Sequence, residues 1–289
     1  MRAVSTPAPH PDRALRPGRA LRPGRALRLA AFGGLVALTL FAVGLAAVSS
    51  AMRPLAVDAF VYWSAWQHPG LYVPDAALWQ AVYLYSPAFA EAFRPLTLIP
   101  WPLFVVLWTA AAFGVYCWLF WPLRLPFRLA ALAFVCAGVL PAGNIEWLLA
   151  LVAVGALRYP AGWALPLLTK ITPGVGVLWY AARGEWRRFA TAIGVTAAIA
   201  LVSFVAAPSL WFGWVHMLEG HHAAMILGVI PEPGPIVRTL VAIPIVVVGA
   251  RTGRSWVLPF SMMLAQPDIG LGALALLAAI PRLSAIPRA

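Results

Sequence analysis

Charged residues are scarce in this chain of 289 residues: they make up 10% of it, whereas 62% of the residues are apolar. A soluble domain carries about 25% charged and about 45–50% apolar residues, so the composition excludes an ordinary soluble globule. Disorder over most of the length is also excluded, because disordered segments have low hydrophobicity. Lipid is therefore the expected main solvent. The length predicts one all-α membrane domain over residues 29–289, with about 8–10 transmembrane helices.

Cysteine and lysine are nearly absent. Cys117 and Cys136 lie in apolar runs, where cysteine usually serves as a small buried hydrophobic residue, although the two could form a pair. No cysteine–histidine spacing typical of a metal site occurs, and we expect neither a metal nor another cofactor. Of the 21 basic residues all but Lys170 are arginine, and the formal net charge is +12. In a membrane protein, this excess is better explained by the positive-inside rule and by binding to anionic lipids than by a nucleic-acid partner.

Residues 1–28 form a basic tail in which RALRPG is repeated. Its prolines and glycines oppose a long helix, so we predict a disordered tail on the cytoplasmic face. It would enforce the positive-inside rule, or alternatively hold a specific lipid or partner site. A signal peptide is the other interpretation, because an apolar run ending in Ser49-Ser50-Ala51 follows. The run from Leu29 to Met52 is long enough to cross a membrane, and we predict that it is retained as the first span.

Two polar, aromatic stretches interrupt the remaining apolar runs and are predicted as outside loops, over residues 53–82 and 208–235. The predicted spans are 84–98, 101–121, 126–140, 144–157, 162–181, 189–207, 237–250, 255–265 and 269–281. The pair within 126–157 is short enough to be tilted, broken or re-entrant.

Alternating crossings from a cytoplasmic N-terminus divide the arginines between the two faces. The outside would hold Arg53, Arg124, Arg128, Arg158 and Arg238, and the inside Arg94, Arg183, Arg187, Arg188, Arg251, Arg254, Arg282 and Arg288. The arginines of residues 1–28 add to the inside. The chain is therefore predicted to be a multi-pass protein of the plasma membrane with its N-terminus in the cytoplasm.

Lys170 is the clearest charge inside a predicted span. A lysine at the bilayer centre costs roughly 3 kcal/mol, so it needs a cavity, a counter-ion or an anionic ligand. One interpretation is a structural ion pair with Glu146 or Glu91, and the other is a site for a lipid phosphate. Pro173 would break the helix nearby, which suits a bend that lines a cavity.

Other polar residues allow both a functional and a structural interpretation. Asp58 follows the first span among apolar neighbours and suits a general base, or else a helix cap or a solvated loop acid. Asn144 and Glu146 open a predicted helix, where a cap and a first-turn acid are the simpler explanation. Ser86 is a natural N-cap before Pro87. His216 and Glu219 have a metal-type spacing, although ordinary interfacial residues explain them better.

Several of these stretches, taken in order, resemble glycosyltransferase family 87, whose members are mannosyltransferase-like proteins of the GT-C class. They are Asp58–Trp63, Gly70–Tyr72, Tyr85–Phe89, Gly143-Asn144, Leu168–Gly174, Arg183–Arg188 and Pro208–Trp211, within roughly residues 55–260. The resemblance implies a GT-C-like helical bundle that uses a polyprenyl-phosphate sugar, usually mannose, on the non-cytoplasmic face. It places the family's catalytic acid at Asp58 and the lysine of its Lys-x-x-Pro stretch at Lys170.

The expected chemistry distributes roles among these residues. Asp58 would take the proton of the acceptor hydroxyl, on a glycolipid or glycan, and direct displacement would invert the anomeric centre. The candidates for the donor phosphate are Lys170, Arg53, Arg158 and Arg238. The candidates for the sugar or acceptor are Tyr62, Trp63, Tyr85, Asn144, Glu146, Trp211 and His216. The alternatives are a transporter or lipid flippase, against which no internal repeat is seen, and a non-catalytic homologue acting as a scaffold.

Overall fold

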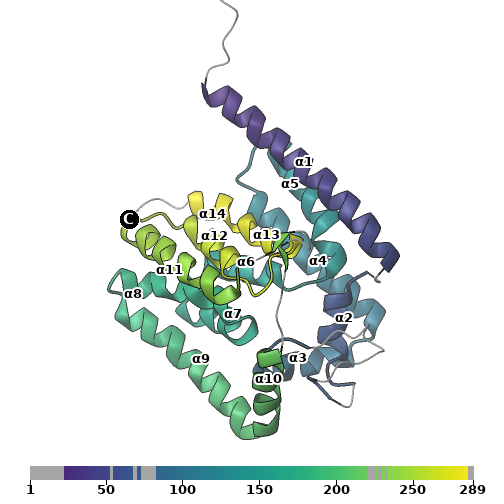
Figure 1. Cartoon of the computed structure of the whole chain (residues 1–289), viewed down its shortest axis with the longest axis vertical. Coiled ribbons are helices and arrows are strands. Elements are labelled where there is room, and N and C mark those ends of the chain that lie inside the picture. Colours follow the sequence, from purple (N-terminus) through teal and green to yellow (C-terminus); the bar gives the residue numbers. More distant parts are fainter. Residues whose placement is uncertain are drawn as a thin grey trace, which may run out of the picture.

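The computed structural model describes residues 23–52, 55–67, 70–72, 83–220, 225–226, 230–231 and 233–285. These residues are almost wholly helical (Figure 1), apart from a short antiparallel pairing of β1 (Met225–Ile226) with β2 (Ile230–Pro231). Four helices within them are long and apolar enough to cross a membrane: α1 (Pro23–Met52), α4 (Trp101–Phe120), α5 (Leu125–Gly138, extended by the 3-10 turn η3, Leu140–Ala142) and α9 (Trp186–Ala206). The all-α membrane class is thereby confirmed, with fewer full-length spans in the described residues than the 8–10 predicted.

Helix α1 begins at Pro23, six residues inside the predicted tail, and not at Leu29. Proline is well tolerated in the first turn of a helix, because the amide hydrogen that it lacks would have no helical partner there. Residues 1–22 lie outside the described residues. The helix packs along α5, where the rings of Phe32 and Phe127 meet edge to face. Much of its remaining apolar surface is exposed, as expected of a helix that faces lipid.

Residues 84–98 do not form the predicted span. They contain only α3 (Pro87–Phe93) and the 3-10 helix η2 (Arg94–Leu98), because Pro95 and Pro100 interrupt the helical hydrogen bonding. A seven-residue helix is about 10 Å long, far short of the bilayer core. The chain therefore stays at one end of the bundle, and α4 and α5 run in the opposite directions to those predicted.

Residues 160–182 enter the bundle and return to the same end, in place of the single crossing predicted for 162–181. One arm consists of η4 (Pro160–Trp163) and α7 (Ala164–Thr169), and the other of η5 (Thr172–Val177) and α8 (Leu178–Ala182). A Cβ atom at Gly176 would lie 2.1 Å from the ring of Trp163, so only glycine lets the two arms approach this closely. We call this unit the re-entrant hairpin. Lys170 lies at its tip.

Hydrogen bonds between distant segments identify one end of the bundle, which we call the arginine end. Arg188 donates to Leu157 O, Arg183 to Ala250 O at the end of α11 (Pro235–Arg251), and Arg282 to Trp118 O near the end of α4. Arg128 donates to Trp121 O. Eleven described arginines lie in the segments joined by these contacts or at the start of α1, which lies beside the start of α5: Arg25, Arg28, Arg124, Arg128, Arg158, Arg183, Arg187, Arg188, Arg251, Arg254 and Arg282.

The predicted division of the arginines was therefore partly wrong. Arg124, Arg128 and Arg158 were expected on the face opposite to Arg183–Arg188 but lie with them, because residues 84–98 and 160–182 are not crossings. Arg94 was expected on the same face as Arg183–Arg188, but it lies over Trp66 at the other end, where Arg238 also lies. That end, which we call the pocket end, also holds α2 (Val57–Ser64) and α10 (Pro208–Gly220).

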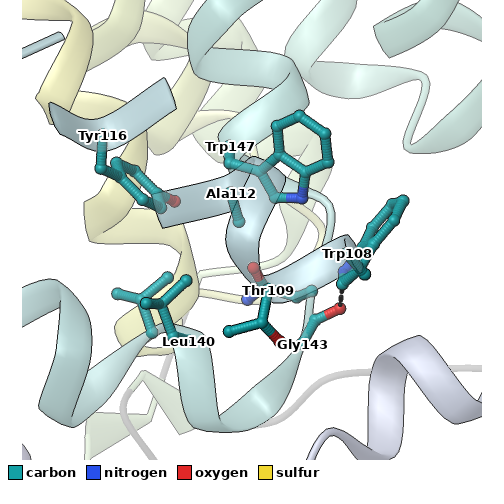
Figure 2. Close-up of a pocket in the computed structure, with 9 residues that line it drawn as sticks. Trp108, Thr109, Ala112, Tyr116, Leu140, Gly143 and Trp147 are labelled. Atoms are coloured by element: carbon teal, nitrogen blue, oxygen red, sulfur yellow. Dashed lines mark hydrogen bonds between the residues drawn. The ribbon is translucent and has the colours of Figure 1, made fainter. Parts of the chain in front are cut away.

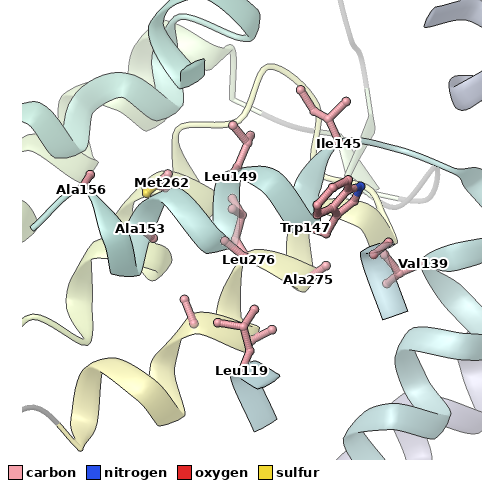
Figure 3. Packing of buried hydrophobic residues seen from close by; sticks show 14 of the residues in the cluster. Leu119, Val139, Ile145, Trp147, Leu149, Ala153, Ala156, Met262, Ala275 and Leu276 are labelled. Carbon is pink, nitrogen blue, oxygen red and sulfur yellow. The ribbon is translucent and has the colours of Figure 1, made fainter. Parts of the chain in front are cut away.

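The core surrounds α6 (Glu146–Gly155), as Figure 3 shows. Leu149 and Ala153 are fully buried against α12 (Val257–Leu264) and the last helical segment, which comprises α13 (Leu271–Leu274), η6 (Ala275–Ala279) and α14 (Ile280–Ser284). The N-terminus of this buried helix points to the pocket end, so its first residues reach the candidate site on a rigid support.

Candidate active site

Helix α2, which carries Asp58, is fixed against the turn that follows α5. The amide of Ala56 donates to Pro141 O at 2.7 Å, and a Cβ atom on Gly143 would lie 2.8 Å from that of Ala59. Gly143 also has φ +71°, a value that glycine adopts without strain. Trp108 donates to the carbonyl of Gly143 from the adjacent α4 (Figure 2). The void beside this contact measures about 10 Å³, enough for one water molecule and too small for a substrate.

Three aromatic side chains tie α2 to neighbouring segments. The hydroxyls of Tyr62 and Tyr85 lie 2.8 Å apart, while Trp63 donates to Ile99 O and Trp66 to Ala90 O. Tyr62 is 1% exposed and packs among aromatic rings. Trp63 uses its only donor within the fold. Neither side chain lines the two cavities described below, and the contacts that the structure shows for both hold the helix that presents Asp58.

The segment that precedes α3 was predicted correctly. Ser86 is the N-cap: its side chain accepts from the amide of Phe89, and Pro87 follows in the first turn. The hydroxyl of Ser86 also donates to Leu168 O of the re-entrant hairpin. Burial raises the pKa of Tyr85 above its usual value, so this phenol stays a neutral hydrogen-bonding group.

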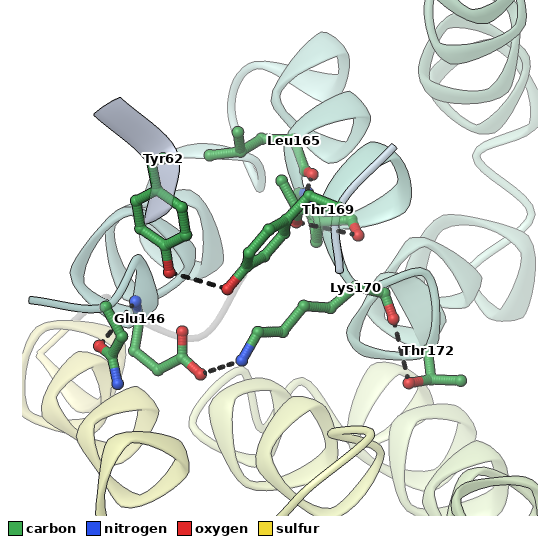
Figure 4. A network of polar contacts seen from close by, with 9 residues as sticks. Tyr62, Glu146, Leu165, Thr169, Lys170 and Thr172 are labelled. Atoms are coloured by element: carbon green, nitrogen blue, oxygen red, sulfur yellow. Dashed lines mark hydrogen bonds and ion pairs between the residues drawn. The ribbon is translucent and has the colours of Figure 1, made fainter. Parts of the chain in front are cut away.

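Lys170 forms a buried ion pair with Glu146. Its Nζ atom lies 2.6 Å from Glu146 Oε1, and the two side chains are 13% and 2% exposed (Figure 4). This is the structural alternative considered for Lys170. Glu146 lies in the first turn of α6, as predicted, and its carboxylate also pairs with the lysine. The side-chain oxygen of Asn144 accepts from the amide of Glu146 at the start of α6, although the N-cap residue is Ile145 and not Asn144 as predicted. An ammonium group has three donors, so the pair leaves Lys170 able to bind a second anion.

Two cavities meet at this ion pair. The first, of about 430 Å³, lies between the hairpin tip, Tyr85 and α10. The second, of about 370 Å³, lies between the C-terminal end of α1, the turn after α5, and α13. Asp58, Lys170 and Asp268 line both cavities, and Asn144 and Glu146 line the second. Two ligand-sized spaces that share one carboxylate-rich junction suit a reaction between two substrates.

Asp268 was missed by the sequence analysis. It lies in the turn between α12 and α13, where the buried Arg238 donates to Pro267 O and to Pro233 O and so ties two walls of the first cavity together. Arg238 thus lies close to the site, where it holds these two segments together. A lone acid between two apolar runs was the available signal, the same signal that singled out Lys170.

Residues 83–288 match glycosyltransferase family 87. The chain belongs to that family. No curated protein and no solved structure matches it. Family membership implies a glycosyltransferase, which needs a sugar donor and an acceptor. The matched range contains Tyr85, Glu146, Lys170 and Asp268, whereas it begins after Asp58.

Three further candidates of this family 87 chain, Arg158, Trp211 and His216, do not line the two cavities. Arg158 is exposed at the arginine end, because it lies in the turn over residues 156–160. Its guanidinium group lies 5.4 Å from the ring centroid of Tyr159. Trp211 donates to Ser203 and packs on Trp214, which lines the first cavity in its place. His216 is exposed, and its Nδ1 atom lies 3.7 Å from Oε2 of Glu219.

The last predictions concern Arg53, the two cysteines and a metal site. Arg53 lies outside the described residues. Cys136 is exposed on α5, so the expectation of two buried cysteines was wrong for it, while Cys117 is partly buried; both are free thiols. Within the described ranges no three histidine, cysteine or acidic side chains gather as ligands for a metal ion.

Proposed function

We propose that this protein transfers a sugar, which we infer to be mannose, from a polyprenyl phosphate to a hydroxyl group of a lipid or glycan acceptor. Membership of family 87 supports a sugar donor and an acceptor. The observation that carries the proposal is the junction of two cavities at Asp58, Lys170 and Asp268. A lipid-linked donor suits a site at one end of a helical membrane bundle, where the sugar can lie in the cavity and the lipid chain between helices.

The residues supply the groups that a direct displacement requires. Asp58 accepts the proton of the acceptor hydroxyl, whose oxygen forms the new bond to the anomeric carbon while the bond from that carbon to the phosphate oxygen breaks. The polyprenyl phosphate leaves with the electron pair, and the anomeric configuration inverts. Lys170 donates to the phosphate as its negative charge grows. Glu146 keeps the lysine charged and aimed at the junction.

We place the pocket end on the non-cytoplasmic side. The arginine end collects eleven of the described arginines, and positively charged ends of membrane proteins remain in the cytoplasm. This orientation agrees with the predicted cytoplasmic N-terminus, because α1 begins at the arginine end. A donor carried by a lipid in the outer leaflet would then reach the cavities without crossing the bundle.

The decisive experiment measures sugar transfer in membranes that contain wild type, Asp58→Asn or Glu219→Gln. Polyprenyl-phosphate mannose labelled in the sugar serves as donor and a crude glycolipid extract as acceptor. We expect Asp58→Asn to lose more than about 100-fold in rate, within the range attributed to a general base, while Glu219→Gln, whose side chain is 72% exposed outside both cavities, keeps normal activity.

Each other result has a defined meaning. Equal transfer by wild type and Asp58→Asn, at equal levels of inserted protein, would remove Asp58 from the mechanism. No transfer by the wild type with mannose, glucose or arabinose donors would contradict the transferase proposal, and lipid flipping in vesicles would then test the transporter alternative.

A further inference from the structure

The tip of the re-entrant hairpin is a strained turn centred on an isoleucine. Ile171 has φ 53° and ψ −66°, and the amide of Thr172 donates to the carbonyl of Lys170 at 2.6 Å. These values and this i to i+2 hydrogen bond describe a γ-turn with positive φ, which is rare and strained. A branched residue is an outlier in this region, whereas glycine would adopt it with little cost.

The surrounding structure holds the turn in place. The carbonyl of Leu168, just before the tip, accepts from Ser86, and the side chain of Leu167 occupies the space where Gly174 lacks a Cβ atom. The packing of Gly176 on Trp163 closes the arms further down. Strain of this kind persists only where neighbours over-determine the conformation, and it concentrates at ligand sites.

The exposure and surroundings of the Ile171 side chain indicate the function of the strained turn. Although apolar, it is 44% exposed, and it lines the first cavity together with Leu84, Trp214 and Leu218. Lys170 and Asp268 line the same cavity. The cavity is therefore amphipathic: an apolar wall lies next to an ammonium group, as a lipid with an anionic headgroup requires. A glycine at position 171 would give the turn without strain but would remove part of that wall.

We propose that Ile171 contacts the apolar chain of a lipid substrate immediately next to the anionic headgroup that Lys170 binds. The proposal rests on the proposed function and assigns the first cavity to a lipid-linked substrate. The isoprenoid donor and a phospholipid-based acceptor share this chemistry, and their kinetic constants distinguish them. Ile171 is thus a residue that determines substrate affinity, and the strain in its backbone is the cost of presenting its side chain.

The test compares Ile171→Ala, Ile171→Gly and Ile171→Leu by steady-state kinetics of sugar transfer, with donor and acceptor varied in turn. We expect the alanine and glycine variants to raise KM for one lipid substrate about tenfold, with kcat changed less than twofold, and leucine to restore KM, because the loss is that of apolar contact area. We expect the melting temperature of Ile171→Gly in detergent to equal or exceed that of the wild type, since glycine relieves the strain. Ile199→Ala on α9, where the isoleucine is 42% exposed and outside both cavities, is the matched control.

The substrate whose KM rises identifies the occupant of the first cavity. Unchanged KM values for both lipids would overturn the proposal while leaving the transferase function intact, because the wild type in the same assay reports that function. A lower melting temperature for Ile171→Gly would overturn the claim that the turn is strained.

Discussion

The two ends of the bundle use charge in different ways. At the arginine end, Arg128 and Arg282 donate to carbonyl oxygens near the end of α4, and their guanidinium groups lie over the rings of Trp121 and Trp118. Carbonyls at a helix C-terminus lack helical partners, and a cation there is favourable. At the pocket end the ion pair of Lys170 with Glu146 is buried, and two further carboxylates share its cavities.

The effect of removing a charge depends on where that charge lies. An exposed arginine contributes little individually, because water and neighbouring arginines compensate for its loss. A buried ion pair leaves an uncompensated charge when one partner is removed, so a single substitution has a large effect. The total positive charge of the arginine end should therefore matter more than any one of its arginines. At the pocket end, single residues should be essential.

The largest expected effect concerns the orientation of the two ends. In a background with Cys117→Ala and Cys136→Ala, a cysteine replacing Glu219 at the pocket end should react with a membrane-impermeant maleimide in intact cells. A cysteine replacing Arg187 at the arginine end should react only after the membrane is permeabilised. The reverse pattern would exclude a pocket end on the outside, whatever the activity of the protein.

The next largest effect is expected when the buried ion pair of Lys170 with Glu146 is broken. Lys170→Met should lower the free energy of unfolding by about 3 kcal/mol, because Glu146 would remain buried and unpaired. It should also abolish measurable transfer. The double variant Lys170→Met with Glu146→Gln should recover much of the stability and none of the activity. Recovery of both, measured by thermal unfolding and by the transfer assay, would show that Lys170 has only a structural role.

The packing of the re-entrant hairpin predicts an intermediate effect. Gly176→Ala should lower stability by about 1–3 kcal/mol, because its Cβ atom would clash with the buried Trp163. Gly194→Ala on α9 is the control: nothing lies within 4 Å of its Cβ position, and alanine in an open helical position should stabilise the protein by about 0.5–1 kcal/mol. Melting temperatures in one detergent compare the two. Equal changes would show that the hairpin arms are not closely packed.

The smallest effect is expected at Arg158. Arg158→Gln should leave kcat and the KM for the donor within about twofold of the wild type, because this exposed residue lies at the end opposite to the cavities. The same assay that measures Asp58→Asn provides the comparison. A large rise in the KM for the donor would restore Arg158 as a phosphate ligand and contradict the separation of the two ends.

Local patterns predicted the segments that depend on nearby residues alone. The long apolar runs of α4 and α9 and the capping of α3 by Ser86 with Pro87 were confirmed, because helix length and capping are decided within a few residues. The interruption near Pro173 was confirmed as well. The direction of the chain was predicted poorly, because residues 84–98 and 162–181 are not single crossings and each of them changes the direction of the segments that follow.

Composition and periods of a few residues were enough to predict a lipid environment and a helical fold. The sequence by itself also singled out Asp58 and Lys170, since an isolated charge in an apolar run is visible without a structure. Tertiary structure decided which charges meet. Glu146 pairs with Lys170, and Asp268 lines the same cavities as Asp58, because the hairpin returns on itself and α13 packs against the turn that follows α5. Such contacts depend on close packing between segments far apart in the chain, which no local pattern specifies.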